Sequence, residues 1–170
     1  YRELETVSLS EKPVVWQDRL QLTGDSIYAE LPGKKISNIY SKKLNDKPGT
    51  ESSFALTSNE DEYFSDRYDQ IRGDDIIIKF SDDKINEIEV DNNSSSVYFV
   101  YEENKANGAN KIEGSRMYLY FDDEEKISKI KIETEPKGEY IPESLLNTVS
   151  LILPGFEVIT DRPVRRSVNN

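Results

Sequence analysis

The sequence predicts an all-β protein, built as an elongated antiparallel β-jelly-roll or solenoid-like repeat. Three segments of the chain share one pattern, and each begins at a glycine, namely Gly24, Gly73 and Gly114. Within each segment apolar residues alternate with other residues, which is the period of a β-strand, whereas helical periodicity is weak along the chain. We expect one domain over residues 1–170, with repeat hairpins near 22–40, 71–90 and 112–132 and a short C-terminal tail from about residue 161.

The strand that follows each glycine has one apolar face. Counted from the glycine, the third, fifth and seventh positions are apolar in all three segments. Alternate residues of a strand point to the same side, so these positions predict one buried face for each segment. The predicted inward residues are Ile27, Ala29, Leu31, Ile76, Ile78, Phe80, Met117, Leu119 and Phe121.

A polar stretch after each strand leads into a second strand. The return strands begin with the pattern Lys-Ile-x-x-Ile at Lys35, Lys84 and Lys126, so each segment is a hairpin. A unit of about three strands cannot bury its apolar stripe alone, so the units should stack. Between and after the hairpins we expect strands over 53–57, 97–101 and 156–160, surface loops over 45–50 and 102–110, and one or two helical turns over 142–147.

Charge and composition exclude several classes of protein. A net charge of −11 argues against nucleic acid or an anionic bilayer as the main partner, because both bind basic surfaces. The chain contains no cysteine and no histidine, which removes disulfides, thiolate metal sites and every nucleophile that depends on an imidazole base. No apolar run reaches the roughly 18 residues of a membrane-spanning helix, so we expect a soluble protein from which any leader has been removed.

Acidic pairs are the residues that a calcium site or a polysaccharide-cleaving enzyme would use. The chain has three, Asp74–Asp75, Asp82–Asp83 and Asp122–Asp123. The second and third lie at predicted turns, where aspartate hydrogen-bonds its own backbone, and no D-x-[DN]-x-[DN]-G loop is present. We therefore predict no metal, no cofactor and no catalytic residue, with metal binding or catalysis as the minor alternative.

Other polar and aromatic groups have both a structural and a functional interpretation. Residues 91–96, Asp-Asn-Asn-Ser-Ser-Ser, favour a solvated loop over a cradle for a polar ligand. A basic tail, which we interpret as a frayed terminus rather than a phosphate site, consists of Arg162, Arg165 and Arg166. Outward tyrosines follow ordinary β-propensity, with an aromatic carbohydrate-binding platform as the alternative. They include Tyr28, Tyr118 and Tyr120.

Four runs of the sequence share a family pattern. They are residues 16–39, YDQIRGDDIIIKFSDDKINEIEVDNNSSSVYF over 68–99, NKIEGSRMYLYFDDEEKISKIKIETEPKGEYIPE over 110–143, and GFEVITDRP over 155–163. In this order, and over more than half of the chain, they resemble the LptA/OstA-like family of periplasmic lipopolysaccharide-transport proteins. The last run is similar to the end of the longer branch of that family.

The resemblance implies a jelly roll whose apolar interior groove holds lipid acyl chains. The nine inward residues would line that groove, and the three glycines would be structural anchors. The implied partners are lipopolysaccharide or another lipid, neighbouring jelly-roll proteins of a transport bridge, and other copies of this chain joined head to tail through edge strands. The implied location is the periplasm of a Gram-negative cell, and the family has no catalytic motif to carry over.

Three functions remain open, and a lipid relay is favoured because all nine inward positions are apolar. A carbohydrate-binding or adhesion module of the cell envelope needs outward aromatic rings that are coplanar on one face. A carboxylate-dependent polysaccharide enzyme needs two carboxylates in a cleft. Opposite charges near the two termini would favour head-to-tail over head-to-head contact, with Glu3 and Glu5 at one terminus and the three arginines at the other.

Overall fold

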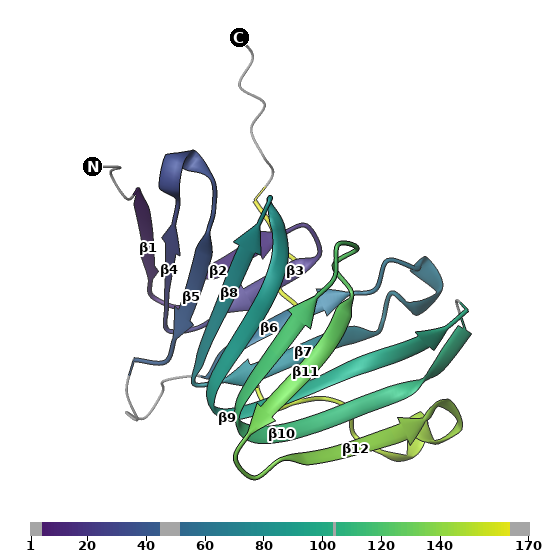
Figure 1. The fold of residues 1–170 in the computed structure, drawn as a ribbon. Helices are drawn as coiled ribbons and strands as arrows, with labels where there is room; N and C mark the ends of the chain where they lie inside the picture. The colour runs from purple at the N-terminus through teal and green to yellow at the C-terminus, as the bar shows by residue number, and fades with distance from the viewer. Residues whose placement is uncertain (1–4, 45–51, 104, 164–170) are drawn as a thin grey trace.

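The regular secondary structure of the described residues is almost entirely β-strand, and the strand pairs are antiparallel (Figure 1). The computed structural model describes residues 5–44, 52–103 and 105–163, so the expected loop over 45–50 lies outside it. The prediction of an all-β, antiparallel fold is confirmed. In the described ranges the strands are β1 Thr6–Ser10, β2 Val14–Gln17, β3 Leu20–Thr23, β4 Ser26–Glu30, β5 Asn38–Lys42, β6 Ser53–Ser58, β7 Tyr68–Gly73, β8 Asp75–Ser81, β9 Lys84–Glu102, β10 Lys105–Phe121, β11 Ile127–Glu133 and β12 Lys137–Pro142, with short 3-10 helices η1 Pro32–Lys34, η2 Glu62–Phe64 and η3 Glu143–Thr148.

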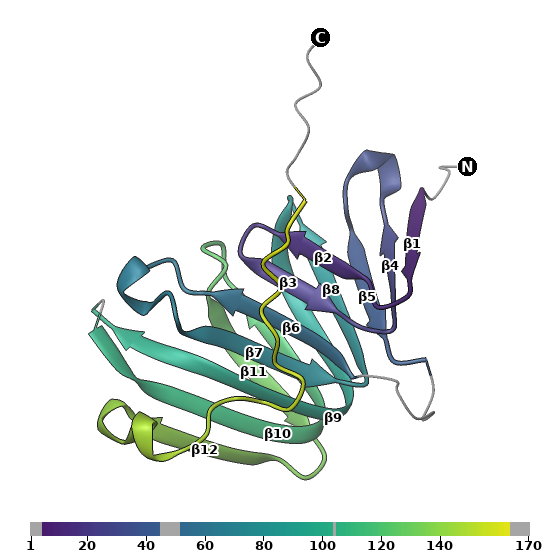
Figure 2. The same ribbon diagram turned by 180° about the vertical axis from the view of Figure 1, so that it is seen from behind.

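The strands form two walls that meet along a corner, so that the protein has the shape of a V (Figures 1 and 2). Wall A consists of β1, β4, β5, β8, the first part of β9, the second part of β10, and β11. Wall B consists of β2, β3, β6, β7, the second part of β9, the first part of β10, and β12. The chain makes one hairpin in a wall, passes the corner and makes the next hairpin in the other wall.

Each repeat glycine lies at this corner. Gly24 separates β3 from β4, Gly73 ends β7 just before β8, and Gly114 lies at the bend of β10. A Cβ atom on Gly73 would lie 2.3 Å from Cγ1 of Val90, and one on Gly114 would lie 2.3 Å from Cγ2 of Ile132. No side chain fits at these distances, because the apolar side chains of the neighbouring strands already fill the corner.

Two predicted loops are wrong. Residues 91–96 are the corner segment of β9, and their three serines are buried. Asn92 and Asn93 have φ values of 56° and 53°, which asparagine adopts more readily than most residues, so β9 turns the corner without leaving the sheet. Most of residues 102–110 belong to β10, which begins at Lys105.

The acidic pairs between β8 and β9 and between β10 and β11 form turns, as predicted. Asp82 and Asp83 have φ values of 51° and 65°, and two successive positive φ values are typical of a tight hairpin turn. Oδ1 of Asp122 accepts hydrogen bonds from the backbone N–H groups of Glu124 at 2.9 Å and Lys126 at 3.0 Å. The carboxylate of Asp122 therefore stabilises the reversal between β10 and β11.

Side chains from both walls meet inside the V and form the main apolar cluster. Burial of this area is the largest favourable contribution to folding, and it holds the walls together at the corner. Its buried members are Ile27, Ile39, Ile76, Ile78, Ile88, Val90, Met117 and Leu119 from wall A, and Leu20, Leu22 and Ala55 from wall B.

Residues 149–163, here called the strap, cross the outer face of wall B (Figure 2). Two buried glutamines, Gln70 on β7 and Gln21 on β3, hold the strap by their side-chain amides. Each amide donates to one strap carbonyl and accepts from the N–H two residues further on. The four bonds are Gln70 Nε2 to Leu151 O (2.9 Å), Leu153 N to Gln70 Oε1 (2.9 Å), Gln21 Nε2 to Glu157 O (2.8 Å) and Ile159 N to Gln21 Oε1 (2.8 Å).

A second apolar cluster lies between the strap and wall B. The ring of Phe156 contacts Phe54 and Tyr68, with ring centres 6.3 Å and 5.7 Å apart. The predicted strand over 156–160 is wrong, because the strap gives its backbone hydrogen bonds to glutamine side chains instead of a neighbouring strand. The predicted helical turns over 142–147 are confirmed by η3. The cluster consists of Phe54, Leu56, Val97 and Leu153, with Tyr68, Leu151 and Phe156 packed against them.

Both ends of the described chain lie at the same end of the V, where β1 and β2 are the outermost strands (Figure 1). The carbonyl of Glu5 accepts from the N–H of Leu31, and Arg162 donates to the carbonyl of Asp18, both at 2.7 Å. The prediction that acidic and basic termini mark opposite ends is therefore wrong, because the strap returns the C-terminal part of the chain to the β1–β2 end. Arg162 is held there rather than frayed. Glu3, Arg165 and Arg166 lie outside the described residues.

Candidate functional site

Eight of the nine residues predicted to face inward lie on β4, β8 and β10, and Leu31 follows the end of β4. Eight of them belong to the interior cluster or pack against it. Ile76, Ile78 and Met117 are fully buried, and Leu119 is 1% exposed. Leu31 is the exception, because β4 ends at Glu30 and Leu31 immediately precedes η1. Strand alternation thus brings three distant parts of the sequence onto one apolar surface inside the V.

The apolar surface of wall A becomes more exposed from the corner towards the tips of its strands. Phe80 and Phe121, at the far ends of β8 and β10, are only half-buried. The same is true of Ile85 on β9 and Ile127 on β11. The walls diverge away from the corner, so wall B does not cover these tips (Figure 1). An apolar surface that opens to solvent between two walls is a place where an apolar ligand can enter.

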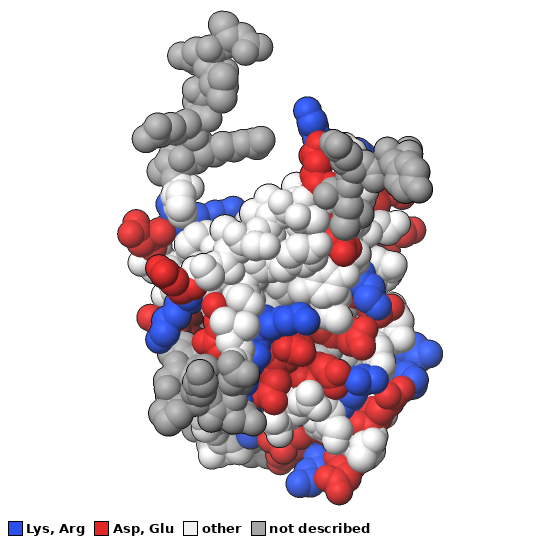
Figure 3. Space-filling model, turned by 90° about the vertical axis from the view of Figure 1, so that its left-hand side faces the viewer, with Lys and Arg blue, Asp and Glu red and all other residues white. Residues whose placement is uncertain are grey.

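The inner surface also continues to the β1–β2 end. Val7 and Leu9 on β1 lie opposite Ala29 and Ile27, so they face the same side, yet they are 47% and 39% exposed. Neither β1 nor β2 contains a charged residue, in a chain of which charged residues are 32%. Figure 3 views this end of the molecule and shows uncharged surface in its upper part, with acidic and basic side chains around and below it.

The inner face of wall B changes from apolar to polar with distance from the corner. In the row nearest the corner, Ile71 on β7 and Ile112 on β10 lie on either side of Ser96 on β9. Both isoleucines pack against the interior cluster. The next row is polar, and sequence reasoning missed it, although strand parity from Ile71 places its first member on the inner face. It contains Asp69, Tyr98 and Asn110.

Asp69 is the titratable group of this inner face. Its Oδ1 accepts a hydrogen bond from the backbone N–H of Phe99 at 2.9 Å. Burial raises the pKa of Asp69 to about 6, and the bond from Phe99 and the charge of Arg19 oppose that rise only in part. The carboxyl therefore changes its charge close to neutral pH.

Tyrosines gather on the outer face of wall A, where the sequence allows an aromatic platform. Tyr28 and its cross-strand partner Tyr40 have ring centres 5.6 Å apart and ring planes tilted by 46°. Lysines cover the other two rings: Lys131 lies 5.2 Å from the ring centre of Tyr118, and Lys129 lies 5.6 Å from that of Tyr120. These rings are neither coplanar nor uncovered, which disfavours them as a sugar-stacking surface.

Charged pairs occupy the rest of this outer face. Lys79 contacts Glu87 at 2.6 Å and Glu89 at 3.4 Å, and the hydrogen bond to Glu87 raises the pKa of Lys79. Arg116 donates two hydrogen bonds to the carboxylate of Asp91, at 3.1 Å and 2.7 Å, and lowers its pKa. The outer face of wall A is thus a solvated, charge-paired surface, opposite in character to its inner face.

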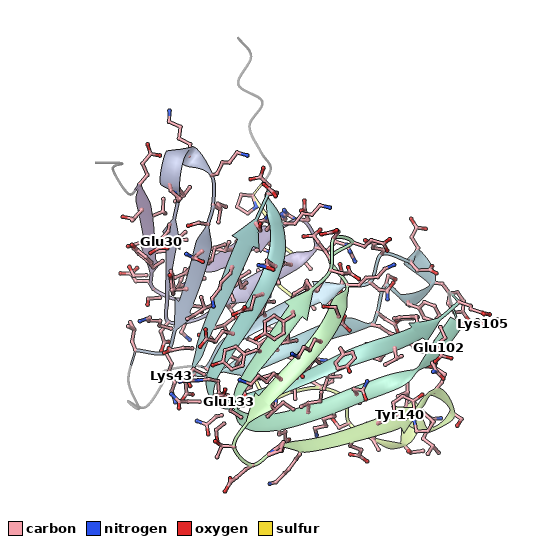
Figure 4. The ribbon with its side chains drawn as sticks, viewed as in Figure 1. Glu30, Lys43, Glu102, Lys105, Glu133 and Tyr140 are labelled. Carbon is pink, nitrogen blue, oxygen red and sulfur yellow. The ribbon has the colours of Figure 1, made fainter. Side chains whose placement is uncertain are left out.

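Other candidate sites do not assemble in the part of the chain that the structure describes. No three acidic residues there come close enough to hold a metal ion. Among the same residues, no helix has the length and apolar character needed to cross a bilayer. Two surface hollows lie outside the V. One is at the β9–β10 turn, where Figure 4 labels Glu102 and Lys105, and the other is beside the strap, lined by residues that include Arg72 and Lys111.

The fold and site together define a V-shaped antiparallel jelly roll with an apolar inner surface that is open at its tips and at one end. No protein-family model matches the chain, and no curated protein matches its sequence. Among solved structures, the chain is similar to the crystal structure of LptH, the LptA-homologous periplasmic component of the lipopolysaccharide transport device of Pseudomonas aeruginosa. The two are 13% identical with a TM-score of 0.49, over 82% of this chain and 96% of that one.

Proposed function

We propose that this chain is a non-catalytic, periplasmic lipid-binding protein that relays lipopolysaccharide between the inner and the outer membrane. The observation that carries the proposal is the continuous apolar inner face of wall A, which runs from β4 to β11 and stays open at its tips. The nine inward residues other than Leu31 form this face. The lipid's acyl chains lie against its half-buried members such as Phe80 and Phe121, because Ile76, Ile78 and Met117 are themselves fully buried. The kind of lipid comes from the sequence resemblance to OstA-like proteins.

The dimensions of this surface fit an acyl chain. The six strands from β4 to β11, spaced by about 4.8 Å, extend over about 24 Å. A strand of seven residues such as β8 extends over roughly 23 Å. The half-buried tips at Phe80 and Phe121 supply the apolar area that binding would remove from water.

Neighbouring molecules would extend the groove through the ends of the V. All five residues of β1 are exposed, and this edge strand carries no charge that would prevent pairing with another strand. At the opposite end, β11 and β12 each pair only with β10 in the described structure. Head-to-tail pairing of β1 with β11, and of β2 with β12, would continue both walls into a second copy or a related jelly roll.

The absence of catalysis is part of the proposal and follows from the residue types. The chain has neither histidine nor cysteine to serve as base or nucleophile. All nine inward repeat positions are apolar, so the repeats place no pair of carboxylates inside the V. Turnover of a polysaccharide that is lost when one Asp or Glu is replaced would contradict this.

Displacement of a bound fluorescent fatty acid by lipid A or lipopolysaccharide tests the lipid site. Phe121→Asp puts a charge into the apolar groove and should weaken binding at least several-fold. Tyr120→Asp is the matched control, because Tyr120 is the outward neighbour on β10 and is also half-buried. Thermal unfolding of both variants separates lost binding from lost folding.

Two results would overturn the lipid site: binding of neither fatty acid nor lipopolysaccharide, or equal loss in both variants. Mass spectrometry of lipid extracted from protein made in a lipopolysaccharide-producing host gives an independent test. Recovery of sugar without lipid would favour the carbohydrate-binding module instead. The tilted and lysine-covered tyrosines of wall A argue against that outcome.

A further inference from the structure

Ser96 on β9 is a buried hydroxyl in an apolar place. Its side chain is 1% exposed, and its Oγ has no hydrogen-bond partner within the residues that the structure describes. Its cross-strand partners Ile71 and Ile112 both pack against the interior cluster, so Ser96 faces the inside of the V. Nearly all buried polar groups in proteins are paired, which makes an unpaired one a mark of a missing polar partner.

Three further polar side chains adjoin Ser96 on the same face of wall B. Tyr98 lies two residues further along β9, and Asn110 is its cross-strand partner on β10. Asp69 lies two residues before Ile71 on β7, on the other side of Tyr98. All three are half-buried, so each keeps part of its surface exposed. We call Ser96, Asp69, Tyr98 and Asn110 the polar block.

The polar block favours hydrogen-bond donors over anions. Oδ1 of Asp69 already accepts the N–H of Phe99, and an ionised carboxylate offers about four acceptor positions in all. Tyr98 lies between Asn110, its cross-strand partner on β10, and Asp69 on β7, so the block offers a phenol and an amide beside the carboxyl. A phosphate or carboxylate placed here would meet the charge of Asp69, whereas a hydroxyl or an amide N–H would donate to it.

We propose that the polar block binds the uncharged hydroxyl or amide groups at the root of a ligand's acyl chains, and so orients the ligand inside the V. This inference rests on the proposed function, because it needs acyl chains in the apolar interior. Ser96 lies in the apolar row of wall B between Ile71 and Ile112, and the other three residues lie in the next row, two residues further along each strand. A ligand whose chains lie against wall A places its polar root there. The ligand class is an amphiphile with sugar hydroxyls or amide donors next to its acyl chains.

Competition between three amphiphiles of equal chain length tests the proposal on the full chain. Dodecyl maltoside, dodecyl phosphate and dodecanoate each compete with a bound fluorescent fatty acid. We expect dodecyl maltoside to displace the probe at a concentration about tenfold lower than dodecyl phosphate. Ser96→Ala should weaken the binding of dodecyl maltoside several-fold and leave the binding of dodecanoate unchanged. Asp69→Asn should reduce the difference in affinity between dodecyl maltoside and dodecyl phosphate.

Matched controls separate the polar block from general changes. Ser95→Ala removes the hydroxyl of the neighbouring residue, which points to the outer side of wall B, and Asp66→Asn removes an exposed charge near Asp69 in the sequence. Neither should change the order of the three amphiphiles. The inference is wrong if the probe binds but the three amphiphiles displace it equally well. It is also wrong if Ser96→Ala does not change the affinity for dodecyl maltoside, because Ser96 then binds only water. If no amphiphile displaces the probe and the probe itself does not bind, the proposed function fails first.

Discussion

Ile77 and Ile78 are neighbours on β8 that face opposite sides of wall A. Ile78 is fully buried in the interior cluster, whereas Ile77 lies on the outer face between Tyr40 and Glu89. Ile78→Asp should lower the free energy of unfolding by about 3–5 kcal/mol, because it leaves a charge buried without a partner. For a domain of this size that corresponds to a fall in Tm of about 6–20 °C.

The same substitution one residue earlier is the control for this prediction. Ile77→Asp puts its carboxylate on the solvated, charge-paired face, so its Tm should change by only a few degrees. Thermal unfolding followed by circular dichroism measures both variants. Equal Tm values for the two variants would show that the inner and outer faces of β8 have been assigned wrongly.

Asp69 should make the stability of the protein depend on pH in the direction opposite to a salt-bridged carboxylate. Its folded pKa of about 6 lies above the ordinary value of 3.8, so the native state binds the proton more tightly than the unfolded state. The stabilisation that comes from this proton is therefore complete below pH 3.8, and it is lost as the pH rises through about 6. The shift corresponds to at most about 3 kcal/mol at 1.36 kcal/mol per pH unit.

Asp69→Asn removes this titration and keeps an oxygen for the N–H of Phe99. The variant should be more stable than the natural protein at pH 8, and the gain should vanish near pH 4. Urea unfolding of both proteins at the two pH values measures the difference. A gain that is equal at pH 4 and pH 8 would mean that the ionised carboxylate is not disfavoured in the fold.

Strand parity explains why some of these residues could be predicted from the sequence and others could not. Alternation from each glycine identified the inward positions of β4, β8 and β10, because a strand imposes a strict period of two. The prediction failed for Leu31 because β4 ends one residue earlier, and no period in the sequence marks that end. Asp69 and Ser96 were missed because polar residues on an inner face look like loop residues until the strand pairing is known.

At the scale of elements, β9 and the strap depart most from the predicted arrangement. The Asn- and Ser-rich run 91–96 has loop composition, but the corner of β9 needs two residues with positive φ, which asparagine supplies. The strap has the composition of a strand, with apolar residues over 156–160. It pairs with glutamine side chains instead, and nothing local in the sequence shows which distant residues will receive its backbone hydrogen bonds.

Gln70 should be the main attachment of the strap. Gln70→Ala leaves the carbonyl of Leu151 and the buried N–H of Leu153 without these partners, so it should cost about 1–3 kcal/mol. Limited proteolysis should then cut within residues 149–163 faster than in the natural protein. Gln17→Ala is the control, because Gln17 faces the inner side of wall B, away from the strap. Equal cleavage of the two variants would contradict the role of Gln70.

At the scale of the whole molecule, the strap brings the C-terminal part of the chain to the β1–β2 end. The sequence allowed a charge-based rule for association, with acidic and basic termini at opposite ends. The structure contradicts this expectation, because Glu5 and Arg162 lie at the same end of the molecule. What distinguishes the ends is strand composition: β1 and β2 are uncharged, whereas β11 and β12 carry lysines and glutamates. Pairing of backbone edges and apolar contact, rather than opposite charge, would then drive association.

The proposed association should therefore resist salt. Ion pairs between exposed groups weaken as the Debye length shortens from about 10 Å at 0.1 M to about 3 Å at 1 M salt. Apolar contact and backbone pairing at β1 do not weaken in this way. The average mass in sedimentation equilibrium should rise with protein concentration, and it should rise as much at 1 M as at 0.1 M sodium chloride.

Charges placed on the inner side of β1 should abolish the association. The double variant Val7→Lys and Leu9→Lys puts two lysines on an edge strand that is already exposed, so the fold tolerates them while a pairing partner does not. Val149→Lys with Ile152→Lys is the matched control, because it adds the same charge at two exposed apolar residues of the strap. The first variant should sediment as a monomer at all concentrations, and the control should associate like the natural protein. A natural protein that stays monomeric, or a control that dissociates equally, would show that β1 is not the pairing edge.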